Sequence, residues 1–259
     1  MSQLVPLEAT LRAGREAGRK SLVAYLTGGL GDWQGMVAAA VDAGADAVEI
    51  GIPFSDPVMD GPVIQEANEI ALAAGINPST VLDGIAELDL GAPIAVMTYA
   101  NLIYRFGWQR FAERAASVGV SAAVLPDIPL EEIGPWATAA DRAGVETVLL
   151  AAPTSPDDRL GRICERSRGF VYAVGLLGIT GERESLAASA KVIAQRLKDT
   201  TDLPVLVGVG IGTPAQAAEV CEVADGVVVG SAVVRRMLED GTPESVAELV
   251  AGFRAALGT

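Results

Sequence analysis

Residues 46–65 read DAVEIGIPFSDPVMDGPVIQ, and they combine an apolar run, a loop rich in Pro and Asp, and the start of a helical pattern. Side chains alternate between the two faces of a strand, so Glu49 is expected to point away from the more apolar face of the run. The strand is expected to stop at Pro53, and Pro62 is well placed as the first residue of a helix. The stretch therefore predicts a strand-loop-helix unit that brings two carboxylates, Glu49 and Asp60, to one strand end.

The same unit recurs on both sides of this stretch. Apolar runs bounded by turn residues predict eight strands, at residues 21–27, 46–52, 93–99, 121–126, 145–152, 169–174, 203–209 and 225–229. Amphipathic or Ala-rich patterns predict helices at residues 6–18, 33–43, 63–74, 78–88, 108–118, 135–143, 156–166, 185–198, 214–221, from 231 for a short distance, and at 243–256. Three of the helix-to-strand junctions carry a glycine, as helix C-termini prefer: Gly44, Gly119 and Gly144.

Strict alternation of strands and helices implies a parallel sheet, and eight units favour a closed barrel over an open doubly wound sheet. The open sheet also lacks its fingerprint, because no G-x-G-x-x-G follows the first strand. We therefore predict an α/β protein with a (β/α)8 TIM barrel, an extra N-terminal helix, and an additional helix after strand 2 and after strand 8. No linker or low-complexity segment divides residues 1–259, so one domain is expected.

The composition excludes several classes of function. The net charge of -14 over 259 residues disfavours binding to nucleic acid or to anionic membranes, which requires a basic surface. The two cysteines show no metal-ligand spacing, and reduced packing residues fit a cytosolic protein. The N-terminal residues are charged where a signal peptide needs an apolar run, and no run is long enough to span a membrane. A cytoplasmic protein that acts on a small molecule is expected.

Catalytic groups of such a barrel lie at the C-terminal ends of its strands. The chain has no His, and its lysines, at positions 20, 191 and 198, fall outside the strand ends, so imidazole and Schiff-base catalysis are excluded. No cluster of metal ligands is present in the sequence either. The strand ends instead carry carboxylates, tyrosines and an amide: Tyr25, Glu49, Asp60, Tyr99, Asn101, Asp127 and Tyr172.

These residues also allow structural interpretations. Glu49 could be a rim carboxylate satisfied by solvent or by an arginine, and Asp56 is typical of a turn in which Asp caps its own backbone. The three tyrosines could be core aromatics, although their shared position near strand ends favours an apolar pocket.

The ends of strands six, seven and eight are rich in glycine: GITG at 178–181, GVGIGT at 208–213, and Gly230-Ser231. Glycine lets backbone N–H groups approach an anion, and Ser231 begins a short helix whose N-terminal dipole favours phosphate. Loops after strands seven and eight are the usual phosphate site of barrels. One such turn could simply be tight, but three of them favour a phosphorylated substrate held mainly by N–H groups.

With these motifs in this order, the chain resembles the family of tryptophan synthase α subunits over essentially its full length. The most specific match is ADAVEIGIPFSDPVMDGPVIQ at 45–65. Further matches follow in the expected order: MTYANLIYRFG at 97–107, VLPDIPLEE at 124–132, GITG at 178–181, VGVGI at 207–211 and GVVVGSAVV at 226–234. The resemblance implies a lyase of tryptophan biosynthesis that cleaves indole-3-glycerol phosphate to indole and glyceraldehyde 3-phosphate by a retro-aldol reaction, with no cofactor.

The resemblance also implies roles for individual residues. Glu49 would be the main acid and base, and Asp60 the group that engages the indole N–H. Residues that line or support the indole pocket would be Tyr25, Tyr99, Asp127 and Tyr172. Residues around the phosphate would be Thr180, Gly181, Gly210, Gly230 and Ser231.

The family further implies a partner, the β subunit of tryptophan synthase, in an α2β2 heterotetramer. Residues 53–60 and the loop after strand six resemble the surfaces that contact it. Gly175 stands in that loop where many family members carry Ser, which affects how the loop closes. Two alternatives remain open at this stage: a free-standing lyase that releases indole, and a non-catalytic barrel that binds a phosphate ester or acts only as an allosteric partner.

Overall fold

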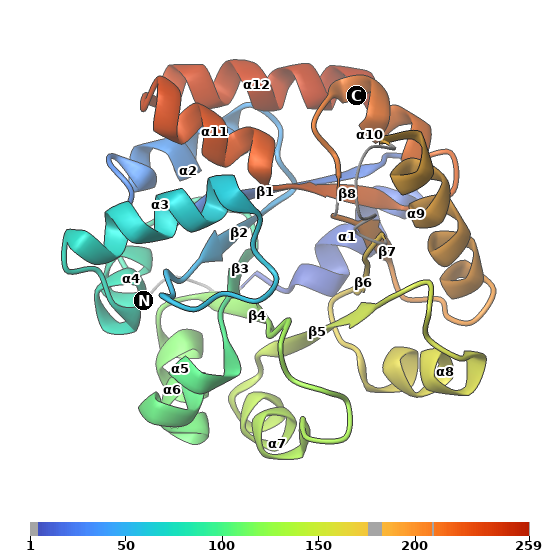
Figure 1. The fold of residues 1–259 in the computed structure, drawn as a ribbon, viewed down its shortest axis with the longest axis horizontal. Helices are drawn as coiled ribbons and strands as arrows, with labels where there is room; N and C mark the ends of the chain where they lie inside the picture. Colours follow the sequence, from blue (N-terminus) through green and yellow to red (C-terminus); the bar gives the residue numbers. More distant parts are fainter. Residues whose placement is uncertain (1–4, 176–182, 209, 259) are drawn as a thin grey trace.

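The computed structural model describes residues 5–175, 183–208 and 210–258. Its eight strands are all parallel and close into a barrel in which β1 pairs with both β2 and β8 (Figure 1). The strands are β1 (Ser21–Thr27), β2 (Ala47–Gly51), β3 (Ile94–Met97), β4 (Val120–Val124), β5 (Glu146–Ala151), β6 (Val171–Ala173), β7 (Val205–Val207) and β8 (Gly226–Val229). The predicted (β/α)8 barrel is therefore confirmed.

All of the helices except α1 lie around the outside of this barrel (Figure 1). The helices are α1 (Leu7–Glu16), α2 (Trp33–Asp42), α3 (Pro62–Ala73), α4 (Pro78–Ile85), α5 (Ala100–Phe106), α6 (Trp108–Ser117), α7 (Gly134–Ala143), α8 (Asp157–Arg166), α9 (Arg183–Lys198), α10 (Pro214–Val220), α11 (Ser231–Glu239) and α12 (Pro243–Ala256). The predicted extra helices are present, because α1 precedes β1 while β2 and β8 are each followed by two helices.

One helix, α5, was absent from the sequence-based prediction. It follows β3 after only two residues and is 7 residues long, too short for a clear period of apolar residues. Its N-terminus has no cap from its own segment, but the Asp127 carboxylate, which follows β4, accepts a hydrogen bond from the Ala100 N–H at 2.9 Å. The helix thus depends on a residue from the neighbouring strand, which local sequence cannot reveal.

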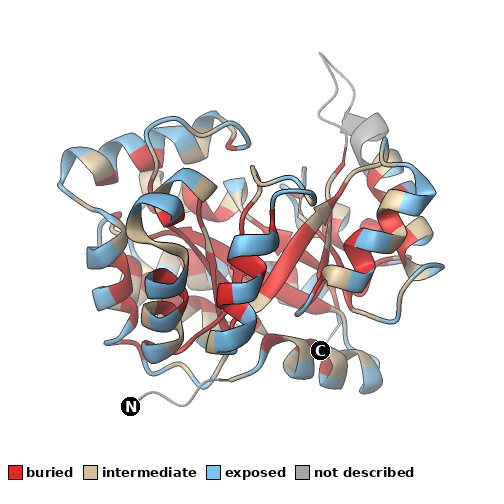
Figure 2. Cartoon of the chain, turned by 90° about the horizontal axis from the view of Figure 1, so that it is seen from below, coloured by how far each residue is buried: buried red, intermediate tan, exposed pale blue. Residues whose placement is uncertain are grey.

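Burial follows the pattern expected of a parallel barrel with a helical shell. Nearly all strand residues are buried, and the exposed residues lie on the outer faces of the helices and in the loops (Figure 2). Parallel strands covered in this way read as continuous apolar runs, which is how the sequence predicted them. A polar residue inside a strand is therefore an exception, and Glu49 is one of the few.

The N-terminal end of the barrel is closed by α1. This helix begins after Pro6, which provides no side-chain cap. Glu146, the first residue of β5, supplies one instead, because its carboxylate accepts hydrogen bonds from the Leu7 and Glu8 N–H groups at 3.0 and 3.2 Å. The opposite end, where the strands finish, is the end that carries the candidate site.

Candidate active site

Glu49 lies in β2, in register with Tyr25 of β1 and Ala95 of β3. Its side chain is 0% exposed, and neither carboxylate oxygen has a hydrogen-bond partner among the described residues. Burial, and secondarily the negative charge of Asp60, raises the pKa of Glu49 to about 8. An unpaired carboxyl in such a place holds its proton at neutral pH, and it can exchange that proton with a bound molecule.

Asp60 lies at the end of the loop after β2, two residues before α3, and is 9% exposed. Pro62 is the first residue of α3, as the sequence predicted. One oxygen of Asp60 accepts a hydrogen bond from the Asn68 side-chain amide at 3.1 Å, and the other has no hydrogen-bond partner in the described part of the chain. Burial raises the pKa of Asp60, whereas polar contacts from Tyr99 and Asn68 oppose that rise.

Tyr25 of β1 and Tyr172 of β6 both lie close enough to Glu49 for its charge to act on their phenols. Burial is the largest cause that raises the pKa of each phenol well above its ordinary value, so both are neutral hydrogen-bonding groups. Each hydroxyl lies against a glycine. A Cβ atom on Gly51 would overlap the Tyr25 hydroxyl, and one on Gly208 would overlap the Tyr172 ring and hydroxyl.

Tyr99 connects the end of β3 to the loop that carries Asp60. Its ring packs against Phe54 with centroids 5.0 Å apart, and its hydroxyl accepts a hydrogen bond from the Met59 N–H at 3.3 Å. Burial, followed by the charge of Asp60, raises its pKa. The Asp127 carboxylate has a structural role here, because it accepts a hydrogen bond from the Ala100 N–H and so supports the backbone that follows Tyr99.

Asp56, which the sequence left open between a turn and the site, is exposed and accepts a hydrogen bond from the neighbouring Ser55 hydroxyl at 2.6 Å. This geometry is that of a local turn. Asn101 is likewise exposed, within α5. Neither residue joins Glu49 and Asp60.

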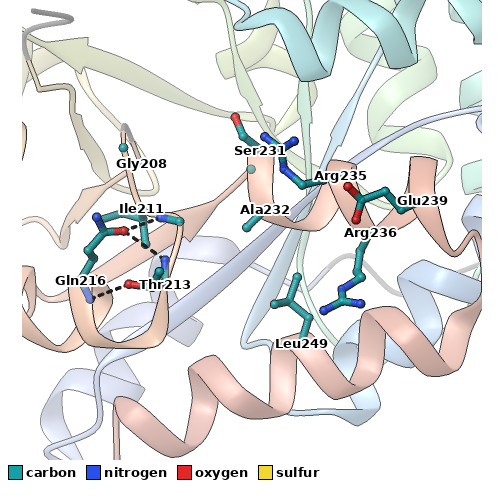
Figure 3. Close-up of a pocket in the computed structure, with 13 residues that line it drawn as sticks. Gly208, Ile211, Thr213, Gln216, Ser231, Ala232, Arg235, Arg236, Glu239 and Leu249 are labelled. Carbon is teal, nitrogen blue, oxygen red and sulfur yellow. Dashed lines mark hydrogen bonds between the residues drawn. The ribbon is translucent and has the colours of Figure 1, made fainter. Parts of the chain in front are cut away.

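The glycine-rich segments after β7 and β8 line a pocket of about 770 Å³ (Figure 3). It contains Gly210, Gly230 and Ser231, and Ser231 is the first residue of α11. Gly210 has φ = +83°, a conformation that side chains rarely adopt. The side-chain amide oxygen of Gln216 accepts hydrogen bonds from the Gly212 and Thr213 N–H groups at 2.9 and 3.1 Å, which fixes one wall of the pocket.

Two arginines of α11 also line this pocket, and the sequence analysis did not identify them. Arg236 pairs with Asp240 at 2.7 Å. Arg235 has no ion-pair or hydrogen-bond partner in the described part of the chain, and Figure 3 shows its guanidinium beside Ser231. Helical side chains point toward the N-terminus, so a residue four positions after Ser231 can reach the start of its helix. That spacing was the signal available in the sequence.

Thr180 and Gly181, predicted near a phosphate, lie outside the described residues. Gly175, the position that departs from the family pattern, is buried at the end of the segment that follows β6. In residues 5–175, 183–208 and 210–258 no three His, Cys, Asp or Glu side chains gather closely enough to hold a metal ion. No helix of the described structure has the length and apolar character required to cross a membrane.

Comparison with known proteins identifies the family. Residues 11–255 match the family described as tryptophan synthase alpha chain. The alpha chain of Streptomyces coelicolor is 47% identical over 254 residues, which cover 96% of this chain and 93% of the relative. That of Thermobifida fusca is 44% identical, covering 96% of this chain and 98% of the relative.

Solved structures agree with these relatives. A chain of tryptophan synthase from Mycobacterium tuberculosis superposes with a TM-score of 0.89 at 32% identity and covers 99% of this chain and 100% of that one. A tryptophan synthase alpha chain from Legionella pneumophila superposes with a TM-score of 0.87 at 32% identity, and the match covers 97% of this chain and 96% of that one. The chain therefore belongs to the tryptophan synthase alpha chain family, lyases that cleave indole-3-glycerol phosphate in tryptophan biosynthesis.

Proposed function

We propose that Glu49 carries the proton in this cleavage and that Asp60 accepts a hydrogen bond from the indole N–H. The observation that carries the proposal is a fully buried Glu49 whose two oxygens have no partner among the described residues and whose pKa is about 8. A carboxyl group with such a pKa can both give and take a proton near neutral pH.

The proton balance of the reaction suits one such group. Cleavage of the bond between indole C3 and the glycerol side chain requires a proton on C3 and the loss of a proton from the glycerol hydroxyl. Glu49 gives the first proton and accepts the second, so the enzyme returns to its starting state. General acid and base help of this kind accounts for roughly 10²- to 10⁴-fold in rate, and positioning in the pocket supplies the remainder.

Protonation of C3 places positive charge on the indole nitrogen, and an ionised Asp60 would stabilise that charge. Its unpaired oxygen is available for the N–H. Tyr25, Tyr99 and Tyr172 would form the walls of the indole pocket, and Asp127 would hold the backbone behind Tyr99. Burial of these walls keeps water away from the reacting atoms.

For the phosphate of the substrate we propose the glycine-rich pocket. The residues around the phosphate would be Gly210, Gly230 and Ser231 within the described structure, together with Thr180 and Gly181. Arg235 would add the positive charge that the lysines do not supply, because its guanidinium has no partner among the described residues and lies beside Ser231 (Figure 3). Backbone N–H groups, the start of α11 and one arginine together suit a dianion.

We also propose that residues 1–259 act as one domain in the cytoplasm, as the α subunit of an α2β2 complex that passes indole to a β subunit. Large apolar side chains are exposed near the strand ends: Val58 is 74% and Met59 38% exposed in the loop after β2, and Tyr104 is 70% exposed in α5. Such a surface beside the site is suited to a protein partner.

The test is to incubate the purified chain with indole-3-glycerol phosphate and to measure indole, with and without a tryptophan synthase β subunit. Release of indole that increases when the β subunit is added supports the cleavage reaction and the association with a β subunit. If indole forms at the same rate with and without the β subunit, the free-standing lyase is the better description. If no indole forms in either mixture, the chain is a non-catalytic barrel.

A further inference from the structure

Helix α3 holds Asp60 at two points. The Asn68 side-chain amide donates a hydrogen bond to the Asp60 carboxylate at 3.1 Å, and the Gln65 side-chain amide donates one to the Asp60 main-chain carbonyl at 2.7 Å. The two donors are three residues apart on α3 and therefore lie on one face of the helix. The helix that follows the loop thus fixes both the backbone and the side chain of Asp60.

Asn68 is an unusual residue for its position. It is 3% exposed, and its own carbonyl oxygen has no hydrogen-bond partner among the described residues. The orientation of the amide follows from chemistry, because an ionised carboxylate can only accept and so requires the NH₂ group of Asn68. A buried amide with an unpaired oxygen costs stability, so stability alone would favour an apolar side chain of the same shape.

We propose that Asn68 is a positioning residue for the reaction: its amide holds one oxygen of Asp60 and thereby leaves the other oxygen to the indole N–H. The inference rests on the proposed role of Asp60. A donor to one oxygen prevents rotation of the carboxylate away from the pocket. It explains why a polar side chain is kept at a buried place where its second polar atom has no partner.

The same hydrogen bond favours the ionised form of Asp60, which the reaction needs. Burial raises the pKa of Asp60, and polar contacts from the Tyr99 hydroxyl and the Asn68 amide both oppose that rise. The other titratable groups that interact with Asp60 are Tyr25 of β1, Glu49 of β2 and Tyr99 at the end of β3. None of these three carries a positive charge, so the Asp60 anion depends on polar contacts, from the Tyr99 hydroxyl and the Asn68 amide, in the described structure.

The experiment compares the pH dependence of kcat/KM for three variants of the full chain acting on indole-3-glycerol phosphate. Asn68→Leu keeps the shape and removes the donor, so the acid limb of the profile moves up by about one pH unit, and kcat/KM falls about tenfold at pH values below the limb of the unmodified chain. The loss appears in kcat more than in KM, because charge on the indole nitrogen develops during the reaction. Asn68→Asp moves the limb further, since two carboxyl groups then share the site.

Gln65→Leu is the matched control. It removes the hydrogen bond to the main-chain carbonyl of Asp60 and none to the carboxylate, so the acid limb stays in place even where kcat/KM falls. A limb that remains in place in both Asn68 variants would overturn the inference, because it would show that Asn68 only fills space.

Asp60→Asn separates this inference from the proposed function. If Asp60→Asn keeps full turnover, the proposed role of Asp60 is wrong. If Asp60→Asn loses turnover, its residual kcat/KM is compared with that of the double variant Asp60→Asn, Asn68→Leu. If Asn68→Leu lowers kcat/KM by the same factor in this background as in the unmodified chain, Asn68 does not act through Asp60.

A measurement without turnover covers the case in which Asn68→Leu does not fold. The Asp60 carboxyl is titrated by ¹³C NMR in the full chain and assigned by its loss in Asp60→Asn. A titration at higher pH in Asn68→Asp or Asn68→Leu than in the unmodified chain supports the inference, and an unchanged titration contradicts it.

Discussion

The Tyr172 ring and hydroxyl occupy the place where a side chain at position 208 would begin. Tyr172 lies on β6 and Gly208 follows β7, and a Cβ atom on Gly208 would overlap the tyrosine. Gly208 is therefore required by its neighbour and not by its own backbone, since its φ is not in the left-handed region. The size of one residue limits the size of the other.

Gly208→Ala is expected to displace Tyr172 and to lower the free energy of unfolding by about 1–3 kcal/mol, as overpacking does. In a Tyr172→Leu background the same substitution should cost much less, because the ring that it would strike is gone. Chemical denaturation of the four chains measures this coupling. Equal costs of Gly208→Ala in the two backgrounds would show that the contact is not limiting.

Glu49→Gln is expected to lose at least the roughly 10²- to 10⁴-fold that general acid and base catalysis contributes, while binding of substrate persists. The amide fills the same volume but cannot exchange a proton. Steady-state release of indole and equilibrium binding of indole-3-glycerol phosphate are the two measurements. Near-normal turnover of this variant would remove Glu49 from the mechanism.

The pH dependence of the reaction should report the same group. Glu49 has to carry a proton when C3 is protonated, and its pKa is about 8. The kcat/KM for indole-3-glycerol phosphate is therefore expected to fall above pH 8 with a slope of one decade per pH unit. A profile that stays flat between pH 8 and 9.5 would assign the proton to another residue.

Glu49 should also make stability depend on pH. Its pKa is about 8 in the folded chain and about 4.5 as an unperturbed group, so between these values the unfolded chain loses the proton first and stability falls as the pH rises. The stability that comes from the protonated Glu49 is fully present below pH 4.5 and is lost as the pH rises to 8. At ~1.36 kcal/mol per pKa unit, Glu49→Gln should be more stable than the unmodified chain by about 3 kcal/mol at pH 7.

Denaturant unfolding at pH 5, 7 and 8 measures that difference. It should grow from pH 5 to pH 8, because only the unmodified chain has to take up a proton at position 49 when it folds. A difference that is constant with pH would show that Glu49 does not carry a raised pKa.

Arg235→Gln is expected to raise KM for indole-3-glycerol phosphate about tenfold with little change in kcat, because the phosphate is remote from the reacting bond. Arg236→Gln is the control, since Arg236 lines the same pocket but is paired with Asp240. The difference between the two variants should shrink at high salt, which screens the charge of an exposed arginine. Equal changes in KM would assign the effect to general charge.

Much of this architecture can be predicted from the sequence because its signals are local. Apolar runs of strand length, glycines such as Gly44 after a helix, and Pro62 at a helix start each act within a few residues. Eight repetitions of that local pattern are enough to predict the closed barrel. The absence of His and the positions of the lysines then left carboxylates and tyrosines at strand ends as the acid and base candidates.

The tertiary structure decided which of these groups act on one another. The cap of α5 comes from Asp127 in the loop after β4, the Asp60 carboxylate is held by Asn68 from the following helix, and Arg235 reaches Ser231 across one turn of α11. A hydrogen bond or a charge contact depends on distances between side chains that the spacing of residues in sequence does not give. The sequence by itself therefore determined the barrel and placed Glu49 and Asp60 at its mouth, whereas closure of the barrel determined their burial, their partners and hence their protonation.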